Sequence, residues 1–404
     1  MKKTGKRKRA VMMKTAETKK KMFLRKNKKK KTPLANSQPM AREKYGFYIP
    51  VDIVSEILLN LPARSLGKFR CVSKSWLSIT SNTAFIRANA QRNPHSLIIE
   101  GMNRSGRYCL ASAEAISESS IRLREYLPLQ FSSDYSLAQA SCDGLICRYH
   151  KIRPCVINPL TGQSVPLPRD GDELNCKLGF YFHHSTSKYR LIRFTDTMHE
   201  SEVLVVGEHS WRRIPGSLPA FFYLPYPLDL NGNIYWLAHS LNEDTSEVPP
   251  DTVVIFDEEK EVYSVISLPP LEKLHDLEAH LLDFNGKLGL WVARKNNTID
   301  VWIMENVWIK RHSINYAQIH ACPSQFNPRW RASVYGAVTI GDEELLIKLS
   351  KCRASECKAP HYIVRCNLKS GACVVRNLMG LSHLSFSTFP YTETLANPQS
   401  PAST

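Results

Sequence analysis

The side chains best suited to bind a metal are four cysteines and one histidine near the C-terminus: Cys352, Cys357, His361, Cys366 and Cys373. Structural zinc usually takes ligands in pairs that are two to four residues apart. Here successive candidates are five, four, five and seven positions apart. Cys366 and Cys373 also lie in strand-like sequence, where cysteine is commonly a small buried apolar residue. We therefore expect no zinc site and no other cofactor.

Sequence patterns typical of catalysis are missing. The chain has no glycine-rich phosphate loop, no Gly-x-Ser-x-Gly turn and no His-Glu-x-x-His motif. The pair His183-His184 falls at an expected turn or strand edge, where histidines are usually solvated. The acidic runs Asp257-Glu258-Glu259 and Asp342-Glu343-Glu344 fall at expected turns, and we interpret them as solvated faces. We therefore expect that this chain is not an enzyme.

The strongest helical pattern lies between Tyr48 and Trp76. Pro50 suits a helix start, because its φ is fixed and its missing N–H would have no partner there. Apolar residues follow at the spacing of one helix face, namely Ile53, Val54, Ile57, Leu58 and Leu61. Pro62 ends this helix, and a second run carries Leu66, Phe69, Val72, Trp76 and Leu77. Helices this short cannot bury all of this apolar surface among themselves, so part of it should meet a partner chain.

This segment resembles the F-box. The matching residues are Ile49-Pro50, Glu56-Ile57-Leu58, Leu61-Pro62, Ser65-Leu66 and Arg70-Cys71-Val72-Ser73-Lys74-Ser75-Trp76, and Phe85 fits a helix that starts after Asn82 or Thr83. Two departures are Ile49, where leucine is usual, and Gly67, which costs about 1 kcal/mol relative to alanine inside a helix. By spacing alone, an ordinary helical hairpin in a larger core is the alternative.

The F-box resemblance implies that the module docks on a Skp-family adaptor and, through it, on a cullin. Ten residues are predicted to face the adaptor or to form the core of the module. They are Ile49, Pro50, Val54, Ile57, Leu58, Leu61, Pro62, Leu66, Val72 and Trp76. The pattern does not separate these two roles residue by residue.

After about residue 93, short β-branched and aromatic runs alternate with turn residues. Three segments share one order, in which a glycine turn leads into an apolar strand and a second strand follows. Their glycines are Gly232, Gly286 and Gly341, which are 54 and 55 positions apart. A period near fifty with several strands in each unit is typical of propeller blades, and a β-sandwich with chance glycine spacing is the alternative.

An earlier segment runs Ser141-Cys142-Asp143-Gly144-Leu145-Ile146-Cys147, and Asn158-Pro159-Leu160-Thr161-Gly162 follows. It resembles the opening signature of the F-box-associated domain of plant F-box proteins, a kelch-like β-propeller. Asp143-Gly144 is expected to turn the chain, residues 145–147 to form a buried strand, and Asn158-Pro159 to begin the next turn. Arg148 departs from the usual apolar residue and leaves the end of that strand open.

The predicted fold class is an α+β multidomain protein, with a small all-α F-box followed by a mostly-β kelch-like propeller. We place a disordered polybasic tail at residues 1–44, the F-box helical domain at 45–93 and the propeller domain at 94–391. A flexible C-terminal tail is expected at 392–404. The number of blades stays open at this stage.

The net charge of +17 is concentrated in the N-terminal tail. Residues 1–31 carry 16 Lys or Arg and one acidic residue, so the rest of the chain has a net charge of only +2. Two clusters are typical of a nuclear localisation signal: Lys6, Arg7, Lys8, Arg9 and Lys28, Lys29, Lys30, Lys31. Non-specific contact with nucleic acid is expected at low salt, but without interleaved aromatic residues base recognition is not. Translation from Met40 would remove this charge.

Several sequence features bear on the compartment. Eleven irregularly spaced cysteines do not form the pattern of a secreted disulfide framework. No apolar run reaches the roughly 20 residues that span a bilayer, and the charged N-terminus lacks the apolar stretch of a secretory signal. We expect a nuclear or cytosolic protein with no membrane contact, and a nuclear one if the basic tail is translated.

The resemblance implies a substrate-recognition subunit of an SCF-type cullin–RING E3 ubiquitin ligase. The F-box would bind the adaptor and the propeller would bind a target protein of unknown identity, while other subunits carry out the chemistry. Two alternatives remain open. One is a nuclear nucleic-acid-associated protein that uses the basic tail, and the other is a propeller that binds a glycan or small ligand.

Overall fold

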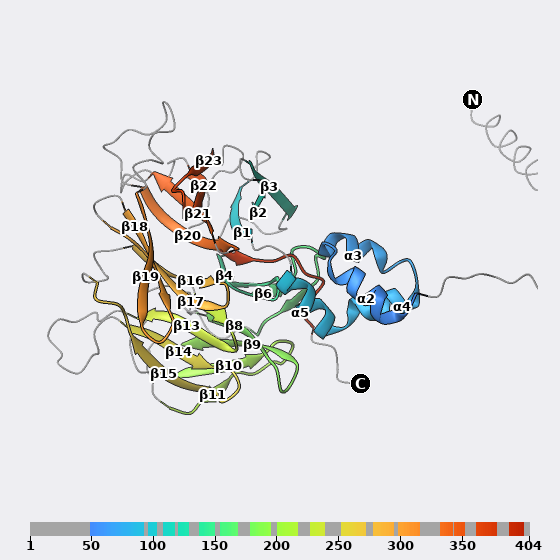
Figure 1. Cartoon of the computed structure of the whole chain (residues 1–404). Helices are drawn as coiled ribbons and strands as arrows, with labels where there is room; N and C mark the ends of the chain where they lie inside the picture. The colour runs from blue at the N-terminus through green and yellow to red at the C-terminus, as the bar shows by residue number, and fades with distance from the viewer. Residues whose placement is uncertain are drawn as a thin grey trace, which may run out of the picture. The chain divides into compact units, whose positions relative to one another are not determined.

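The structure is a computed structural model (Figure 1). It describes residues 49–92, 96–102, 108–117, 120–128, 137–149, 154–168, 178–194, 200–216, 227–238, 252–271, 278–294, 298–315, 332–341, 343–351, 361–377 and 388–399. The basic tail, with its two charged clusters and Met40, lies outside these ranges. Pro50–Thr404 forms one compact unit, so the helical module and the propeller belong to the same body.

Four helices make up the helical module in the described chain: α2 (Val51–Leu59), α3 (Ala63–Phe69), α4 (Lys74–Ser81) and α5 (Thr83–Arg92). Pro50 precedes α2, and Pro62 separates α2 from α3, as predicted. The second apolar run spans two helices because Ser73 starts a new one: its hydroxyl accepts the Trp76 N–H at 3.1 Å. Asn82 caps α5 in the same way.

The other described elements form six antiparallel sheets of four strands, the blades of a propeller (Figure 1). Blade 1 contains β4 (Leu137–Cys142), β5 (Leu145–Tyr149), β6 (Cys155–Ile157) and β7 (Ser164–Pro166). Blade 2 contains β8 (Leu178–His183), β9 (Lys188–Phe194), β10 (Ser201–Val205) and β11 (Arg212–Ile214). Blade 3 contains β12 (Leu228–Leu230), β13 (Asn233–Ala238), β14 (Thr252–Asp257) and β15 (Val262–Ser267).

Blade 4 contains β16 (Glu278–Phe284), β17 (Lys287–Ala293), β18 (Thr298–Met304) and β19 (Trp308–Asn315). Blade 5 contains β20 (Ala332–Ile340), β21 (Glu344–Lys351), β22 (His361–Asn367) and β23 (Cys373–Asn377). Blade 6 joins the two ends of the domain, because β24 (Thr388–Tyr391) pairs with β1 (Ser96–Met102), which is followed by β2 (Tyr108–Ser117) and β3 (Ser120–Pro128). First strands of neighbouring blades contact one another at the centre, for example β24 with β4.

The predicted glycine period is the blade repeat. Gly232 and Gly286 lie in the turns between the first and second strands of blades 3 and 4, and Gly341 lies in the equivalent turn of blade 5. In blades 3 and 4 an asparagine at φ 53° precedes a glycine at φ 76°. This left-handed pair is what a tight hairpin turn requires. The predicted propeller is confirmed, and the described chain forms six blades.

The two ends of the propeller differ in their connections. In an antiparallel blade the turns from first to second and from third to fourth strand lie at the same end, which we call the turn face. It includes Asp143-Gly144 and Asn158. Connections from second to third strand and from blade to blade leave from the opposite end, which we call the loop face. The end of β13 and the start of β14 lie there, as do the end of β19 and the start of β20.

Arg148 is part of β5, which runs to Tyr149, so the strand continues past the unusual residue. Its side chain is buried and lies 2.6 Å from the carboxylate of Glu100 in β1, which is also buried. A buried guanidinium needs such a partner, because an unpaired charge in the interior is strongly unfavourable. The pair joins blade 1 to blade 6.

The C-terminal segment corrects one predicted boundary. We expected a flexible tail from residue 392, yet Thr392, Thr394, Leu395 and Ala396 are buried. The Asn158 side chain donates hydrogen bonds to the carbonyls of Thr394 and Ala396 at 3.0 and 2.8 Å. The prediction is wrong for these residues because their partners are far away in the sequence and give no local signal. Residues 400–404 lie outside the described chain.

Candidate functional site

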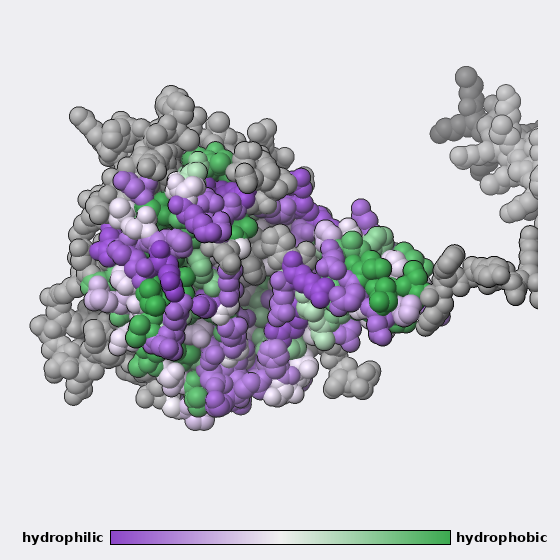
Figure 2. Space-filling view, viewed as in Figure 1, coloured by the Kyte–Doolittle hydropathy of each residue, from purple (hydrophilic) through white to green (hydrophobic). Residues whose placement is uncertain are grey.

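The helical module carries a concentrated apolar surface. Nine large apolar side chains are exposed among the described residues, and six of them lie between residues 49 and 77. Five of these lie in the segment from α2 to α4, and we call them the apolar face: Val51, Ile53, Ile57, Val72 and Leu77. Figure 2 shows apolar side chains gathered over the helical module. Apolar surface gathered in this way marks a protein interaction site.

The ten residues predicted for adaptor contact fall into three groups. Ile49, Pro50, Ile57, Pro62 and Val72 are exposed, whereas Val54, Leu61 and Trp76 are partly buried. Leu58 and Leu66 are fully buried, in a cluster shared with Leu145 of blade 1 and Phe180 of blade 2. The structure thus separates the two roles: exposed members are available to a partner, and Leu58 and Leu66 hold the module against the propeller.

Three exposed members of the apolar face were not among the ten predicted residues. Ile53 and Leu77 are part of the apolar periodicity, which could have identified them, while Val51 lies in the first turn of α2 outside that periodicity. Trp76 packs edge-to-face on Phe69, with ring centroids 5.5 Å apart, and so holds α4 against α3. Asn89 of α5 donates to the carbonyls of Leu59 and Leu61 at 2.8 and 2.9 Å, which fixes the end of α2.

Arg87 of α5 is the main polar contact between the helical module and blades 1 and 2. Its guanidinium lies 3.2 Å from the Asp143 carboxylate and 3.1 Å from a ring nitrogen of His184. It also stacks over the Phe182 ring at 4.4 Å from the centroid. Tyr189 donates a hydrogen bond to the same Asp143 carboxylate at 3.2 Å. One arginine therefore joins the signature turn of blade 1 to the last residues of β8.

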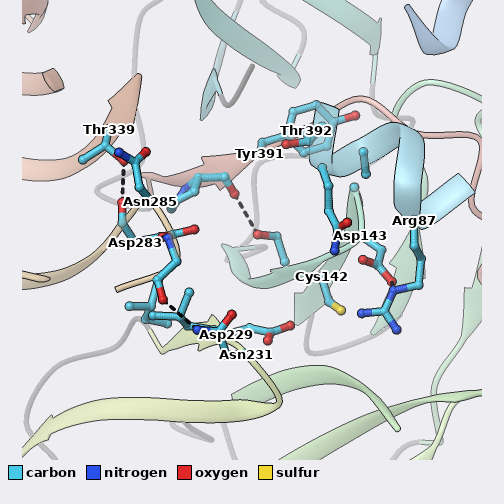
Figure 3. A pocket seen from close by; sticks show the side chains of 18 of the residues that line it. Arg87, Cys142, Asp143, Asp229, Asn231, Asp283, Asn285, Thr339, Tyr391 and Thr392 are labelled. Carbon is cyan, nitrogen blue, oxygen red and sulfur yellow. Dashed lines mark hydrogen bonds and ion pairs between the residues drawn. The ribbon is translucent and has the colours of Figure 1, made fainter. Parts of the chain in front are cut away.

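A cavity of about 690 Å³ opens where α5 meets the first strands of the blades, and we call it the hub pocket (Figure 3). Its charged lining comprises Arg87, Arg92, Asp143, Asp229 and Asp283. In Figure 3 Arg87 lies beside Asp143 of blade 1, and Asp229 lies near Asn231, both in blade 3. Several lining groups are already satisfied: Asn231 donates to the Gly286 carbonyl at 2.7 Å, and Ser141 donates to the Pro390 carbonyl at 2.9 Å.

Two neighbouring acidic residues lie beside the hub pocket, Asp229 and Glu258. Burial and the neighbouring Asp229 raise the pKa of Glu258, so Glu258 keeps its proton near neutral pH. Desolvation by the surrounding protein atoms and the charge of Asp143 also raise the pKa of Asp229, although part of its surface stays exposed in the pocket. Burial raises the pKa of Asp143, and the Arg87 guanidinium opposes this shift.

Two interpretations of polar residues need correction. Glu258 was expected in a solvated run but is buried, because the turn after β14 packs against the hub. His183 was expected to be solvated but is also buried, and its ring nitrogen is bonded to Thr186 at 2.9 Å. Burial lowers the pKa of His183, so the neutral imidazole is favoured. His184 is exposed, as expected.

The predicted metal candidates are only partly within the described chain, since Cys352 and Cys357 lie outside it. Cys366 and Cys373 face each other across the β22–β23 pair, and Cys366 is buried as an apolar residue would be. Within the described ranges no three His, Cys, Asp or Glu side chains gather as metal ligands. In those same ranges, no helix is both long and apolar enough to span a bilayer.

Comparison with known proteins agrees with this architecture. Residues 48–87 match the model of the F-box domain, and residues 98–392 match the model of the F-box associated beta propeller domain. The Arabidopsis thaliana F-box protein At3g10240 is 30% identical over 282 residues, which cover 64% of this chain and 70% of that protein. The F-box/kelch-repeat protein At2g43445 from the same plant is 26% identical over 305 residues, covering 70% and 71%.

Among solved structures, TolB from Acinetobacter baumannii matches with a TM-score of 0.43 and 12% identity, covering 79% of this chain and 73% of that chain. A similarity this low says nothing about function. The propeller model, by contrast, matches more than half of the chain, and its match follows the F-box match in the sequence. The chain therefore belongs to the plant F-box proteins that carry an F-box-associated β-propeller domain.

Proposed function

We propose that this chain is the substrate-recognition subunit of an SCF-type cullin–RING ubiquitin ligase. The F-box module binds a Skp-family adaptor, which links it to a cullin, and the propeller binds a target protein. The chain itself is not an enzyme in this proposal, because it contributes proximity and orientation while other subunits carry out the chemistry. The target stays unidentified.

One observation carries the adaptor part of the proposal. Within residues matched by the F-box model, the apolar face exposes Ile53 and Ile57 on α2 and Leu77 on α4. The opposite side of the module is occupied, since Leu58 and Leu66 are buried against blades 1 and 2. A partner chain therefore has an unoccupied apolar surface to bind on the module.

We place the target on the loop face of the propeller. The turn face is partly covered by α5 and by residues 392–396, through the contacts of Arg87 and Asn158. On the loop face β13 ends and β14 begins, and β19 ends and β20 begins; these strands are separated in the sequence by 13 and 16 residues. Specificity commonly resides in long connections that a rigid scaffold positions.

The adaptor proposal is tested by measuring binding of the purified full chain to a Skp-family adaptor by calorimetry. Ile57→Glu places a charge on the apolar face, where Ile57 is 54% exposed, and should weaken binding at least about 30-fold. Val262→Glu is the matched control, since Val262 is 52% exposed on β15 of the propeller. Both variants should fold normally. Equal binding by wild type and both variants, or no binding by folded wild type, would contradict the proposal.

For localisation we propose a nuclear or cytosolic protein, nuclear when the basic tail is present. The clusters Lys6-Arg7-Lys8-Arg9 and Lys28-Lys29-Lys30-Lys31 support this assignment. A fluorescent fusion of the full chain should accumulate in the nucleus, and the same fusion starting at Met40 should not. An identical distribution of the two fusions would contradict a role of the basic tail in localisation.

A further inference from the structure

The residues that follow the last strand also contribute to the structure. After β24 completes blade 6, residues 392–396 continue between the turn face and the helical module, and we call them the C-terminal strap. Thr394 is fully buried, and Thr392, Leu395 and Ala396 are each less than a tenth exposed. A terminal segment stays ordered only when specific contacts tie it down. The contacts of the strap run in two directions.

Toward the propeller, the strap is held by the two signature turns of blade 1. Thr394 donates its hydroxyl hydrogen to the backbone carbonyl of Asp143. Asn158 donates to the strap carbonyls of Thr394 and Ala396, and its side-chain oxygen accepts the N–H groups of Leu160 and Thr161 at 2.8 and 3.2 Å. Asn158 is fully buried, so its loss would leave two buried carbonyls without this donor.

Gly144 is required for the passage of the strap. A Cβ atom built at this position would lie 2.3 Å from the Thr392 carbonyl oxygen and 2.7 Å from the Thr394 hydroxyl. Its φ of +73° also favours glycine. The turn that begins the signature of blade 1 is therefore shaped around the strap.

Toward the helical module, the strap binds α3. The Glu393 carboxylate lies 2.7 Å from the Arg64 guanidinium, and it also accepts a hydrogen bond from the Tyr126 hydroxyl at 3.0 Å. Leu395 and Ala396 belong to the same apolar cluster as Leu58 and Leu66. A Cβ added at Gly67 of α3 would reach normal contact with Leu395 at 3.5 Å. The strap thus contacts both the module and the propeller.

We propose that the C-terminal strap is a positioning element, which makes the orientation of the F-box helices depend on the closed propeller. Arg87 attaches α5 to blades 1 and 2, and Leu58 of α2 and Leu66 of α3 pack in an apolar cluster shared with the same blades. Apolar packing is non-directional, so it leaves the helices some freedom to rotate on the propeller. The strap adds a directional contact, the ion pair between Glu393 and Arg64 of α3, and restricts that freedom. Given the proposed ligase function, it sets where the bound target stands relative to the adaptor.

Hydrogen exchange of the full chain, measured by mass spectrometry, tests the coupling without any partner. A chain ending at Tyr391 keeps β24 but lacks the strap, and a chain ending at Gln399 is its control. In the strapless chain the amides of α3 should exchange at least about tenfold faster, because local opening becomes easier, while β13 and β17 keep wild-type protection. The control should behave as wild type.

Point variants keep the length of the chain unchanged. Asn158→Ala and Glu393→Gln should each speed α3 exchange, whereas Glu305→Gln should not, although Glu305 also pairs with two basic residues, Lys287 and Arg311. Unchanged α3 exchange in the strapless chain would overturn the proposal. Equal loss of protection throughout the propeller in the strapless chain and in Asn158→Ala would also overturn it, because the strap would then be a general folding element.

The consequence for the ligase is read from a different measurement. In a reconstituted cullin–RING complex, wild type should be self-ubiquitylated on a restricted set of propeller lysines. Asn158→Ala should bind the adaptor as wild type does but spread modification over more lysines. An unchanged set would overturn the positioning role in the ligase. Failure of wild type to bind the adaptor would instead contradict the proposed function and leave the exchange result standing.

Discussion

Neighbouring residues determine the protonation state of Glu258. It ends up buried next to Asp229, with Asp143 and Arg87 acting on it from neighbouring elements. Two neighbouring desolvated carboxyl groups cannot both ionise without a large electrostatic cost. Glu258 therefore holds a proton, and the charge at this part of the hub is smaller than the count of acidic residues suggests.

This proton makes stability depend on pH. A folded-state pKa above the unfolded value means that the folded chain binds more protons, so the free energy of unfolding falls as pH rises from the ordinary glutamate pKa toward the raised one. Glu258→Gln removes the ionisation. Near pH 4 it should match wild type, and at about pH 8 it should be more stable, by on the order of 2 kcal/mol.

Denaturant unfolding at several pH values measures this difference. Glu208→Gln is a suitable control, because Glu208 is an exposed acid and its ion pair with Lys188 is also exposed. A difference between wild type and Glu258→Gln that does not grow with pH would contradict the prediction.

At the scale of elements, the turn between β4 and β5 combines several contacts within four residues. Ser141 binds the Pro390 carbonyl of β24, Asp143 binds Arg87 of α5, and Gly144 lets the strap pass. A hairpin turn alone would need only the left-handed Asp143 and Gly144, at φ 47° and 73°. The remaining features of this turn thus serve contacts with distant parts of the chain.

Two glycine variants separate the demands of the turn from those of the strap. Gly232→Ala changes a glycine at φ 76° with open space around its Cβ position, so it should cost about 1 kcal/mol of stability from backbone strain. Gly144→Ala has the same backbone demand and in addition collides with Thr392, so it should cost at least about 2 kcal/mol more. Urea unfolding measures the free energy of unfolding of both variants. Equal losses of stability would show that the strap shifts to accommodate the added methyl group at no free-energy cost.

The propeller is closed by pairing between β1 and β24, its first and last strands in the sequence. Ser96 is aligned with Tyr391, and the first strands of blades 5, 6 and 1 meet through β24. Without this strand, blade 6 has no inner strand and blades 1 and 5 lose a neighbour at the centre. The ring therefore depends on residues from both ends of the domain.

Deletion of residues 388–404 should lower the melting temperature by about 10 °C or more and broaden the transition, because closure makes the blades unfold together. The chain ending at Tyr391 should keep most of the propeller's cooperativity, since it retains β24. Calorimetry distinguishes the two. If both chains melt alike, closure by β24 is not what holds the blades in one cooperative unit.

The features that could be predicted from the sequence are local ones. The proline-bounded helices, the apolar spacing from Ile53 to Leu61, and the turns at Gly232 and Gly286 each depend on residues within a few positions of one another. Backbone propensities and side-chain periodicity act over that range, so the helical module and the propeller class were predictable. The resemblance to F-box proteins rests on the same short segments.

Tertiary contacts determine which of these residues are exposed to solvent and which are buried. Ile57 and Leu58 are neighbours with similar side chains, yet one is 54% exposed and the other fully buried, because blades 1 and 2 cover only one side of α2. The number of blades, the buried proton of Glu258 and the strap at 392–396 also arise from pairing between distant segments. Sequence patterns do not predict these contacts, because each one joins residues that are far apart in the sequence and come together only when the propeller closes.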